Sequence, residues 1–203
     1  PGITNSRITN HMIRTCEDRA DALAVIDIEN GGYIPSTENT DSFKTRIQNS
    51  KVRTAVDTLE NRGLDTSYAC AFYPWVKIQD QINDRQVWVP PSVVALGTFG
   101  STEARSELWF APAGFTRGGL TEGRGGLPVV AVSQRLSSKE RDKLYEVNIN
   151  PIAQFPAEGI VIFGQKTLQA TPTALDRINV RRLLIFIKKR ISRIASTLLF
   201  EPN

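Results

Sequence analysis

The sequence predicts an α/β fold with a mixed β-sheet flanked by helices. Three short apolar segments, residues 22–28, 68–78 and 159–164, have the composition of strands that are covered on both faces. Apolar residues recur at helical spacing in other segments, and strand, helix and strand follow one another in the order that a right-handed parallel crossover needs. At 203 residues the chain is long enough for one substantial core, and no linker divides it.

The N-terminal half is predicted to alternate between helix and strand. Residues 11–20 form the end of a helix before the strand at 22–28, and residues 31–41 form a polar loop. Helical spacing of apolar side chains predicts a helix over residues 43–59, which Gly63 ends. The strand at 68–78 contains Pro74, which marks an edge or a bend because proline cannot donate a ladder hydrogen bond.

The C-terminal half is predicted to begin with a short apolar helix over residues 89–97, because Pro90 and Pro91 are tolerated in a first turn. A short strand is expected at residues 106–111. Six of the fourteen residues at 113–126 are glycine, which predicts a loop. A helix over residues 137–145, capped by Ser137 or Ser138, and the strand at 159–164 lead to the C-terminal helix.

The C-terminal helix carries two patterns. Asn179 is expected to cap it, and its apolar side chains have the i, i+3, i+4, i+7 spacing of a face buried on the core. The members of this face are Val180, Leu183, Leu184, Ile187, Ile191, Ile194, Ala195 and Leu198.

The second pattern is charge of a single sign. No acidic residue lies between Asp176 and Glu201, and the whole chain is only +4, so the rest of the chain is net negative. A local basic face indicates a defined acidic partner, and the pattern alone leaves nucleic acid and an acidic protein surface equally open. The six basic residues are Arg181, Arg182, Lys188, Lys189, Arg190 and Arg193.

Other features point away from membrane, metal and nucleotide sites. No apolar run approaches the roughly 20 residues of a membrane span. Cys16 and Cys70 lie 54 positions apart, which favours free thiols in a reducing compartment over a disulfide or a zinc site. The glycines from 118 to 123 have P-loop spacing, but Arg124 and Gly125 follow where Lys and Ser or Thr are needed. We therefore expect no metal and no cofactor.

Two weaker patterns leave alternatives open. Asp27 and Glu29 lie at a strand end, where active sites of α/β proteins form, and could serve a hydrolase, although His11 is the only histidine and no nucleophile motif accompanies it. Tyr73 and Trp75 alternate along a strand and could stack bases. Aromatic residues at this spacing more often belong to a core. With a single histidine, no complete P-loop and no metal-binding cluster in the sequence, we expect no catalytic residue.

Nearly the whole chain resembles the tail sheath proteins of contractile-tailed bacteriophages. No single segment is specific, but the segments follow one another in the order of that family. They are HMIRTCE at 11–17 leading into 22–28, residues 67–76, WVPPS at 88–92, WFAPAG at 109–114, NINPI at 148–152, residues 159–168, RINVRRL at 177–183 and LFEPN at 199–203.

This resemblance implies a structural, non-enzymatic subunit of the virion that is made in the host cytoplasm. Its copies would stack as hexameric rings around a tail tube and contract to drive the tube through the host envelope. The chain would be the shared inner domain, the tail-sheath core, with the six basic residues of the C-terminal helix as tube-facing candidates. Its partners would be other sheath subunits and the tube protein, with no membrane and no nucleic acid.

Members of that family begin earlier with an extended arm and continue past the Glu-Pro-Asn position into a further helix and a strand. The arms donate strands to neighbouring subunits. We therefore expect residues 1–203 to be a single inner domain without the N-terminal arm and the C-terminal strand, and to be monomeric alone. The competing hypothesis is a nucleic-acid-binding domain that uses the basic helix.

Overall fold

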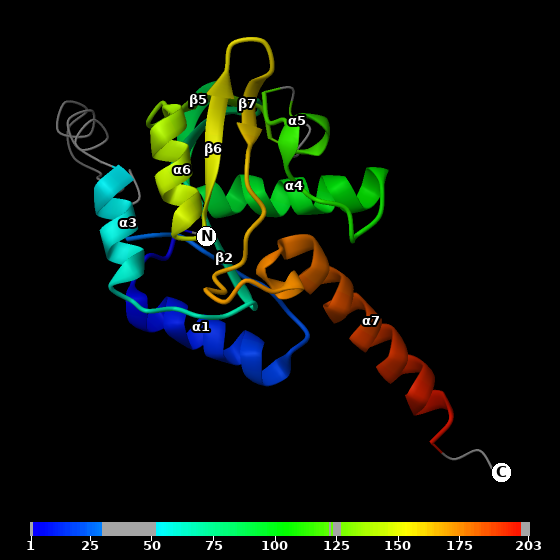
Figure 1. Cartoon of the computed structure of the whole chain (residues 1–203). Coiled ribbons are helices and arrows are strands. Elements are labelled where there is room, and N and C mark those ends of the chain that lie inside the picture. Colours follow the sequence, from blue (N-terminus) through cyan, green and yellow to red (C-terminus); the bar gives the residue numbers. More distant parts are fainter. Residues whose placement is uncertain (1, 30–51, 122, 124–126, 200–203) are drawn as a thin grey trace.

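The computed structural model describes residues 2–29, 52–121, 123 and 127–199 (Figure 1). The elements are α1 (Ser6–Arg19), β1 (Ala24–Ile26), α3 (Val52–Glu60), β2 (Ala69–Tyr73), β3 (Val76–Asp80), β4 (Arg85–Val89), α4 (Pro91–Arg105), α5 (Gly114–Arg117), β5 (Val129–Val132), α6 (Ser138–Glu146), β6 (Ile149–Phe155), β7 (Gly159–Ile162), the 3-10 turn η1 (Ala174–Asp176) and α7 (Ile178–Thr197).

Two sheets form the centre of the fold. The larger sheet has the order β1-β2-β6-β7, in which β1, β2 and β6 are parallel and β7 is antiparallel to β6. The smaller sheet is antiparallel and has the order β4-β3-β5. The predicted mixed sheet with flanking helices is confirmed, and β1 and β2 are the predicted parallel neighbours.

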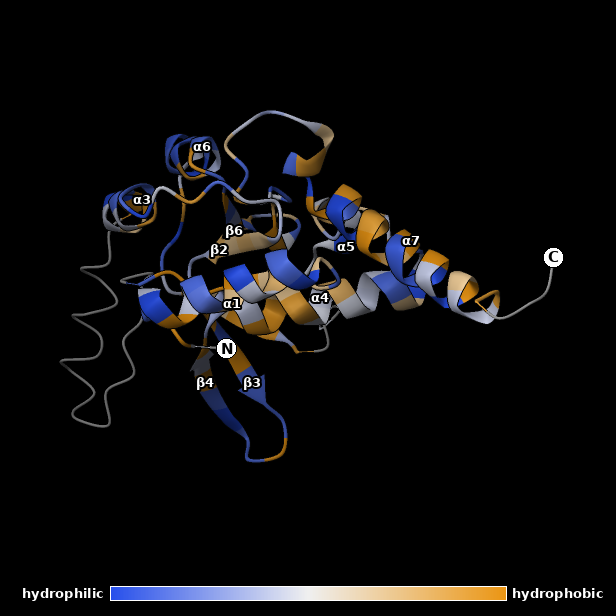
Figure 2. Ribbon diagram, turned by 90° about the horizontal axis from the view of Figure 1, so that it is seen from below, coloured by the Kyte–Doolittle hydropathy of each residue, from blue (hydrophilic) through white to orange (hydrophobic). Residues whose placement is uncertain are grey.

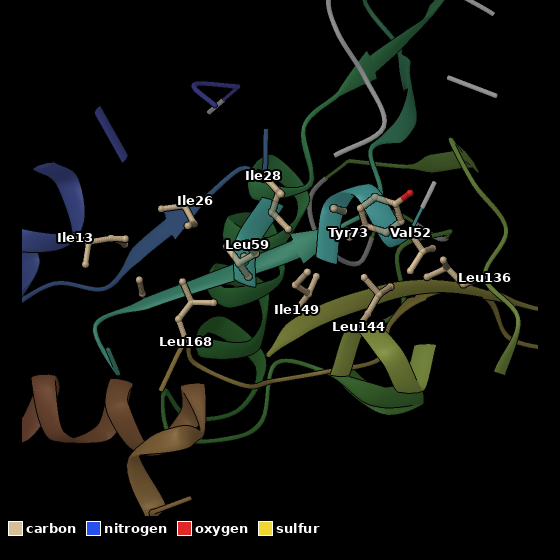
Figure 3. Close-up of a cluster of buried hydrophobic side chains, with 14 residues drawn as sticks. Ile13, Ile26, Ile28, Val52, Leu59, Tyr73, Leu136, Leu144, Ile149 and Leu168 are labelled. Atoms are coloured by element: carbon tan, nitrogen blue, oxygen red, sulfur yellow. The ribbon is translucent and has the colours of Figure 1, made fainter. Parts of the chain in front are cut away.

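The larger sheet is buried on both faces. Alternate residues of β2 contribute to two separate apolar clusters, with Ala69, Ala71 and Tyr73 in one cluster and Cys70 and Phe72 in the other. Figure 3 shows the first cluster, which joins the sheet to α1, α3 and α6. The second cluster fills the space between the sheet, α4 and the smaller sheet. Strands β1, β2 and β7 therefore have the continuous apolar character that predicted them.

Several predicted elements need correction. The strand at 68–78 is two strands in different sheets, separated by a cis bond between Tyr73 and Pro74. Residues 106–111 form no strand; they turn after α4, with a bond from the Phe110 N–H to the Glu107 carbonyl at 3.0 Å. The glycine-rich segment includes the short helix α5, and α4 extends to Arg105.

Two helix predictions fare better. Ser137 caps α6 and forms a full capping box with Glu140, as its position predicts. Helix α3 confirms the second half of the helix expected at 43–59. The first half of that helix and the loop predicted at 31–41 lie outside the described residues.

The backbone that leads into α7 is fixed by Asn150, which is fully buried on β6. Its amide donates to the carbonyls of Ala71 and Lys166 at 3.0 and 2.8 Å, and its Oδ1 accepts from the Lys166 N–H. The backbone at Gly164 passes so close to Asn150 that a Cβ added to this glycine would lie 2.9 Å from the Asn150 Oδ1. The segment after β7 is thereby held against the sheet, and it places the first turn of α7.

Candidate partner-binding helix

Helix α7 begins in the second apolar cluster, where Ile178 is fully buried. The Ile178 N–H donates to the Gln165 carbonyl at 2.8 Å. The N-cap is Arg177, so the expectation for Asn179 is wrong; Asn179 lies in the first turn and donates to the Trp109 carbonyl at 3.2 Å. The start of the helix is therefore set by tertiary contacts rather than by a side-chain cap.

The first two basic residues of α7 are buried. Arg181 is 7% exposed; its guanidinium donates to the Ser67 hydroxyl and lies 3.9 Å from the centre of the Tyr68 ring. Arg182 is 8% exposed and lies 5.0 Å from the centre of the Phe99 ring. The expectation that all six cations are available to a partner is wrong for these two residues.

Arg182 is held by α4. It donates to the Phe99 carbonyl at 3.4 Å and pairs with Glu103 at 3.3 Å. Burial lowers the pKa of the Arg182 guanidinium, and the charge of Glu103 partly opposes that effect. A buried cation is costly unless it is paired and hydrogen-bonded, so these contacts with α4 offset the cost of holding Arg182 at the root of α7.

The middle of α7 leaves the body of the protein between α1 and the segment after α4. Phe186 packs against Trp109 with ring centres 6.2 Å apart, and Lys188 donates to the Arg19 carbonyl at 3.3 Å, where α1 ends. Beyond these contacts the helix projects away from the sheets (Figure 1).

The outer half of α7 is exposed on all sides, including the face predicted to be buried. Val180 and Leu183 are half-buried, but Leu184, Ile187, Ile191, Ile194, Ala195 and Leu198 are exposed. The predicted helix is confirmed. The prediction that the apolar face packs on the core is wrong for these six exposed residues. Figure 2 shows the apolar residues along the projecting end of the helix.

Four of the six predicted site residues remain accessible. Lys188, Lys189, Arg190 and Arg193 are exposed, and no acidic residue lies on α7. Asp21, two residues after the end of α1, is paired with Arg19 at 2.8 Å. Its hydrogen bond with Arg19 lowers the pKa of the Asp21 carboxyl, and the charge of Lys189 also lowers it. The accessible cations therefore form a one-signed surface that can bind an anionic partner.

The alternative catalytic carboxylate has a structural role. Asp27 is 2% exposed and accepts three hydrogen bonds, from the Gly2 N–H at 2.7 Å, the Ser92 N–H at 3.1 Å and the Ser92 hydroxyl at 2.7 Å. Since Pro90 supplies no side-chain cap, Asp27 caps the N-terminus of α4 from the end of β1. Glu29 is exposed and has no part in this arrangement.

The glycine-rich segment runs along β7 instead of forming a phosphate cradle. The Leu120 N–H donates to the Ile160 carbonyl at 2.8 Å, and the Gly118 carbonyl accepts from the Ile162 N–H at 2.9 Å. A Cβ at Gly118 would lie 2.6 Å from the Ile162 carbonyl, so only glycine allows this approach. Leu120 is fully buried, which makes this part of the segment a piece of the core.

The structure also places the other residues that the sequence singled out for base stacking, catalysis and metal binding. Tyr73 and Trp75 are buried in the core and cannot stack on bases, and His11 is exposed on α1. Across the described parts of the chain, no group of His, Cys, Asp and Glu could hold a metal ion, and no helix is both long and apolar enough to cross a membrane. Cys16 and Cys70 are free, as expected.

Comparison with curated proteins finds tail sheath proteins. The chain is 37% identical over 165 residues to the tail sheath protein of Vibrio phage KVP40, a match that covers 81% of the chain and 23% of the relative. It is 30% identical over 202 residues to that of Enterobacteria phage T4, covering 98% of the chain and 29% of the relative. The chain is a relative of the contractile tail sheath proteins. It spans about a quarter of the length of these sheath relatives, and no family model matches it.

Solved structures of contractile machines share the fold. A chain of an extracellular contractile injection system, the PVC sheath complex in its contracted state, aligns with a TM-score of 0.59 and 25% identity over 83% of this chain and 41% of the other. A chain of the anti-feeding prophage baseplate in its contracted state aligns with a TM-score of 0.63 and 21% identity, covering 98% and 48%. The predicted sheath resemblance is confirmed in sequence and in fold.

Proposed function

We propose that the protein is a structural subunit of a contractile bacteriophage tail sheath. Its copies stack as hexameric rings around a tail tube and contract to drive the tube through the host envelope. The observation that carries this proposal is the match to tail sheath proteins along 98% of the chain. The protein acts in the virion after synthesis in the host cytoplasm, and its role is mechanical, with no catalytic residue, cofactor or metal.

Residues 1–203 are assigned to one inner domain, with α7 facing the tube. The basis for this orientation is the set of four exposed cations on the projecting helix: Lys188, Lys189, Arg190 and Arg193. Exposed ion pairs contribute only about 0–1 kcal/mol each and are screened by salt. Attachment through several such pairs is additive and reversible, which suits a sheath that must slide on its tube during contraction.

The ring contacts are assigned to segments outside this domain. The two apolar clusters give residues 1–203 a core of their own. Without exchanged strands, the contacts that remain between neighbouring domains are expected to be too small to hold a ring in dilute solution. The isolated domain is therefore monomeric.

Reversal of the four exposed cations to Glu in the complete sheath protein should reduce assembly on purified tubes at least tenfold and leave the fold intact. The measurement is the yield of sheathed tubes by electron microscopy, with thermal unfolding as the test of folding. The matched control reverses four cations that are exposed outside α7 and changes the net charge equally; they are Arg7, Arg14, Arg135 and Lys139.

Normal assembly of the α7 variant, or equal losses in both variants, would refute tube attachment through α7. The exposed basic helix also supports nucleic acid as a second candidate partner. Binding to DNA through these four cations would have a slope of log affinity against log salt of roughly −3 to −4. Tight binding to DNA with such a slope, and none to tubes, would favour that candidate.

A further inference from the structure

The exposed apolar residues of α7 form a narrow row, which we call the α7 seam. Leu184, Ile187, Ile191, Ile194 and Leu198 are spaced alternately by three and four positions. Residues with this spacing lie above one another on a single face of a helix. The row extends along about 20 Å of helix, at a rise of about 1.5 Å per residue. This is the spacing of the contact line between two packed helices.

The seam is open to solvent throughout. Leu184 and Ile187 are 41% and 39% exposed, and the three outer residues are 59% to 61% exposed. Single exposed apolar residues are ordinary, but a continuous row on a projecting helix marks an interaction surface. The exposure increases outward, so the part of the seam that projects furthest is also the part most available to a partner.

The shape of the seam favours a helix over a membrane surface. Ile185 and Phe186 are half-buried toward the body of the protein, and Phe186 packs on Trp109. The exposed apolar stripe is therefore limited to two positions in seven, which matches the seam of a helix pair. A helix that lies in a lipid surface needs a broader apolar face.

The positive charges beside the seam favour an acidic partner over a second copy of α7. Lys188 and Arg190 flank the seam, one on each side of Ile187 and Ile191, as the 3.6-residue turn of the helix requires. Lys189 and Arg193 lie on the opposite face of the helix, and α7 has no acidic residue. A second copy of α7 on the seam would bring two such cationic clusters within about one Debye length, roughly 8 Å, and they would repel each other. Acidic residues on the facing helix would instead form pairs across the seam.

We propose that the α7 seam binds an amphipathic α-helix of a protein partner, with Leu or Ile at alternating three- and four-residue spacing and with Glu or Asp on both flanks. This surface consists of the apolar row, which has no part in the proposed tube contact, and of two cations, Lys188 and Arg190, that the seam shares with the set assigned to the tube. The inference does not depend on the sheath function.

The test uses the 203-residue protein and a synthetic 21-residue helical peptide with Leu along its seam and Glu on both flanks. Binding is measured by fluorescence anisotropy in 0.15 M salt. Ile191→Ser combined with Ile194→Ser should weaken binding about 100-fold, because two apolar side chains lose burial worth about 1.5 kcal/mol each. The control variant Ile82→Ser, at an exposed apolar residue outside α7, should bind as the wild type does.

A second peptide with Lys in place of each Glu should bind at least tenfold more weakly. Circular dichroism checks that the double variant keeps its helix content. Four results would each overturn the proposal: no binding of the Glu peptide, equal binding of the two peptides, dimerisation of the protein that the seam variant abolishes, or seam-dependent binding to anionic lipid vesicles that is tighter than binding to the Glu peptide.

Discussion

Replacement of Asp27 by Ala should lower the free energy of unfolding by about 3 kcal/mol, because it removes the cap of α4 and leaves buried donors without an acceptor. The carboxylate accepts from two backbone N–H groups and from the Ser92 hydroxyl, and it is almost fully buried. In a domain of this size the loss corresponds to a fall in melting temperature of about 6–12 °C.

The measurement is urea unfolding followed by circular dichroism. Glu29→Ala is the matched control, since Glu29 is an exposed carboxylate two residues away, and its loss should change stability by less than about 0.5 kcal/mol. A stable Asp27→Ala protein that has lost a hydrolytic activity of the wild type would instead support the catalytic alternative.

Charge reversal at Arg182 should be the most damaging change on α7. Arg182→Glu would place a carboxylate beside Glu103 and the Phe99 carbonyl, which now accept from the guanidinium. A buried, unpaired charge should cost more than about 4 kcal/mol, enough to abolish folding. Arg193→Glu, on the exposed part of the same helix, should change stability by less than about 0.5 kcal/mol.

Soluble yield and urea unfolding distinguish these two variants. Arg182→Met is a third variant that keeps the packing of the side chain without its charge, and we expect it to fold with a loss of about 2 kcal/mol from the lost hydrogen bonds. If Arg182→Glu were as stable as the wild type but failed to assemble on tubes, Arg182 would be a partner-binding residue after all.

The contrast between Arg182 and Arg193 shows where sequence patterns stop being informative. Spacing predicts that α7 is a helix, because amphipathic periodicity is a local property. Spacing does not show which part of the helix meets the rest of the chain. That depends on Tyr68 and Phe99, which come from distant segments and provide aromatic faces and a carbonyl for the two buried guanidinium groups.

Strands, too, are predictable from the sequence only where their local pattern is clear. The fully buried β2 is recognisable as an apolar run, whereas β6 is missed because Pro151 interrupts its pattern. Pro151 lacks an N–H for the ladder, but its carbonyl still accepts from the Phe163 N–H at 2.8 Å. Strands β4 and β5 are half-exposed and short, so their patterns are weak. The local capping box at Ser137, by contrast, is predictable from four residues.

The role of Asp27 was beyond sequence reasoning for a related reason. A carboxylate at a strand end is equally compatible with catalysis and with capping. Only the position of Ser92, 65 residues further along the chain, shows that the hydrogen-bonding capacity of Asp27 is used within the fold.

In the proposed function, this domain contacts the tail tube through the exposed cations of α7. Site-specific photocrosslinking in assembled sheaths of the complete protein tests this contact, with the crosslinker placed at position 193 or, as the control, at position 135, where Arg135 is also exposed but lies away from α7. We predict that the crosslinker at position 193 joins the sheath to the tube protein and that the one at position 135 does not. Crosslinks to the tube from position 135 alone, or crosslinks from position 193 only to nucleic acid, would contradict this account.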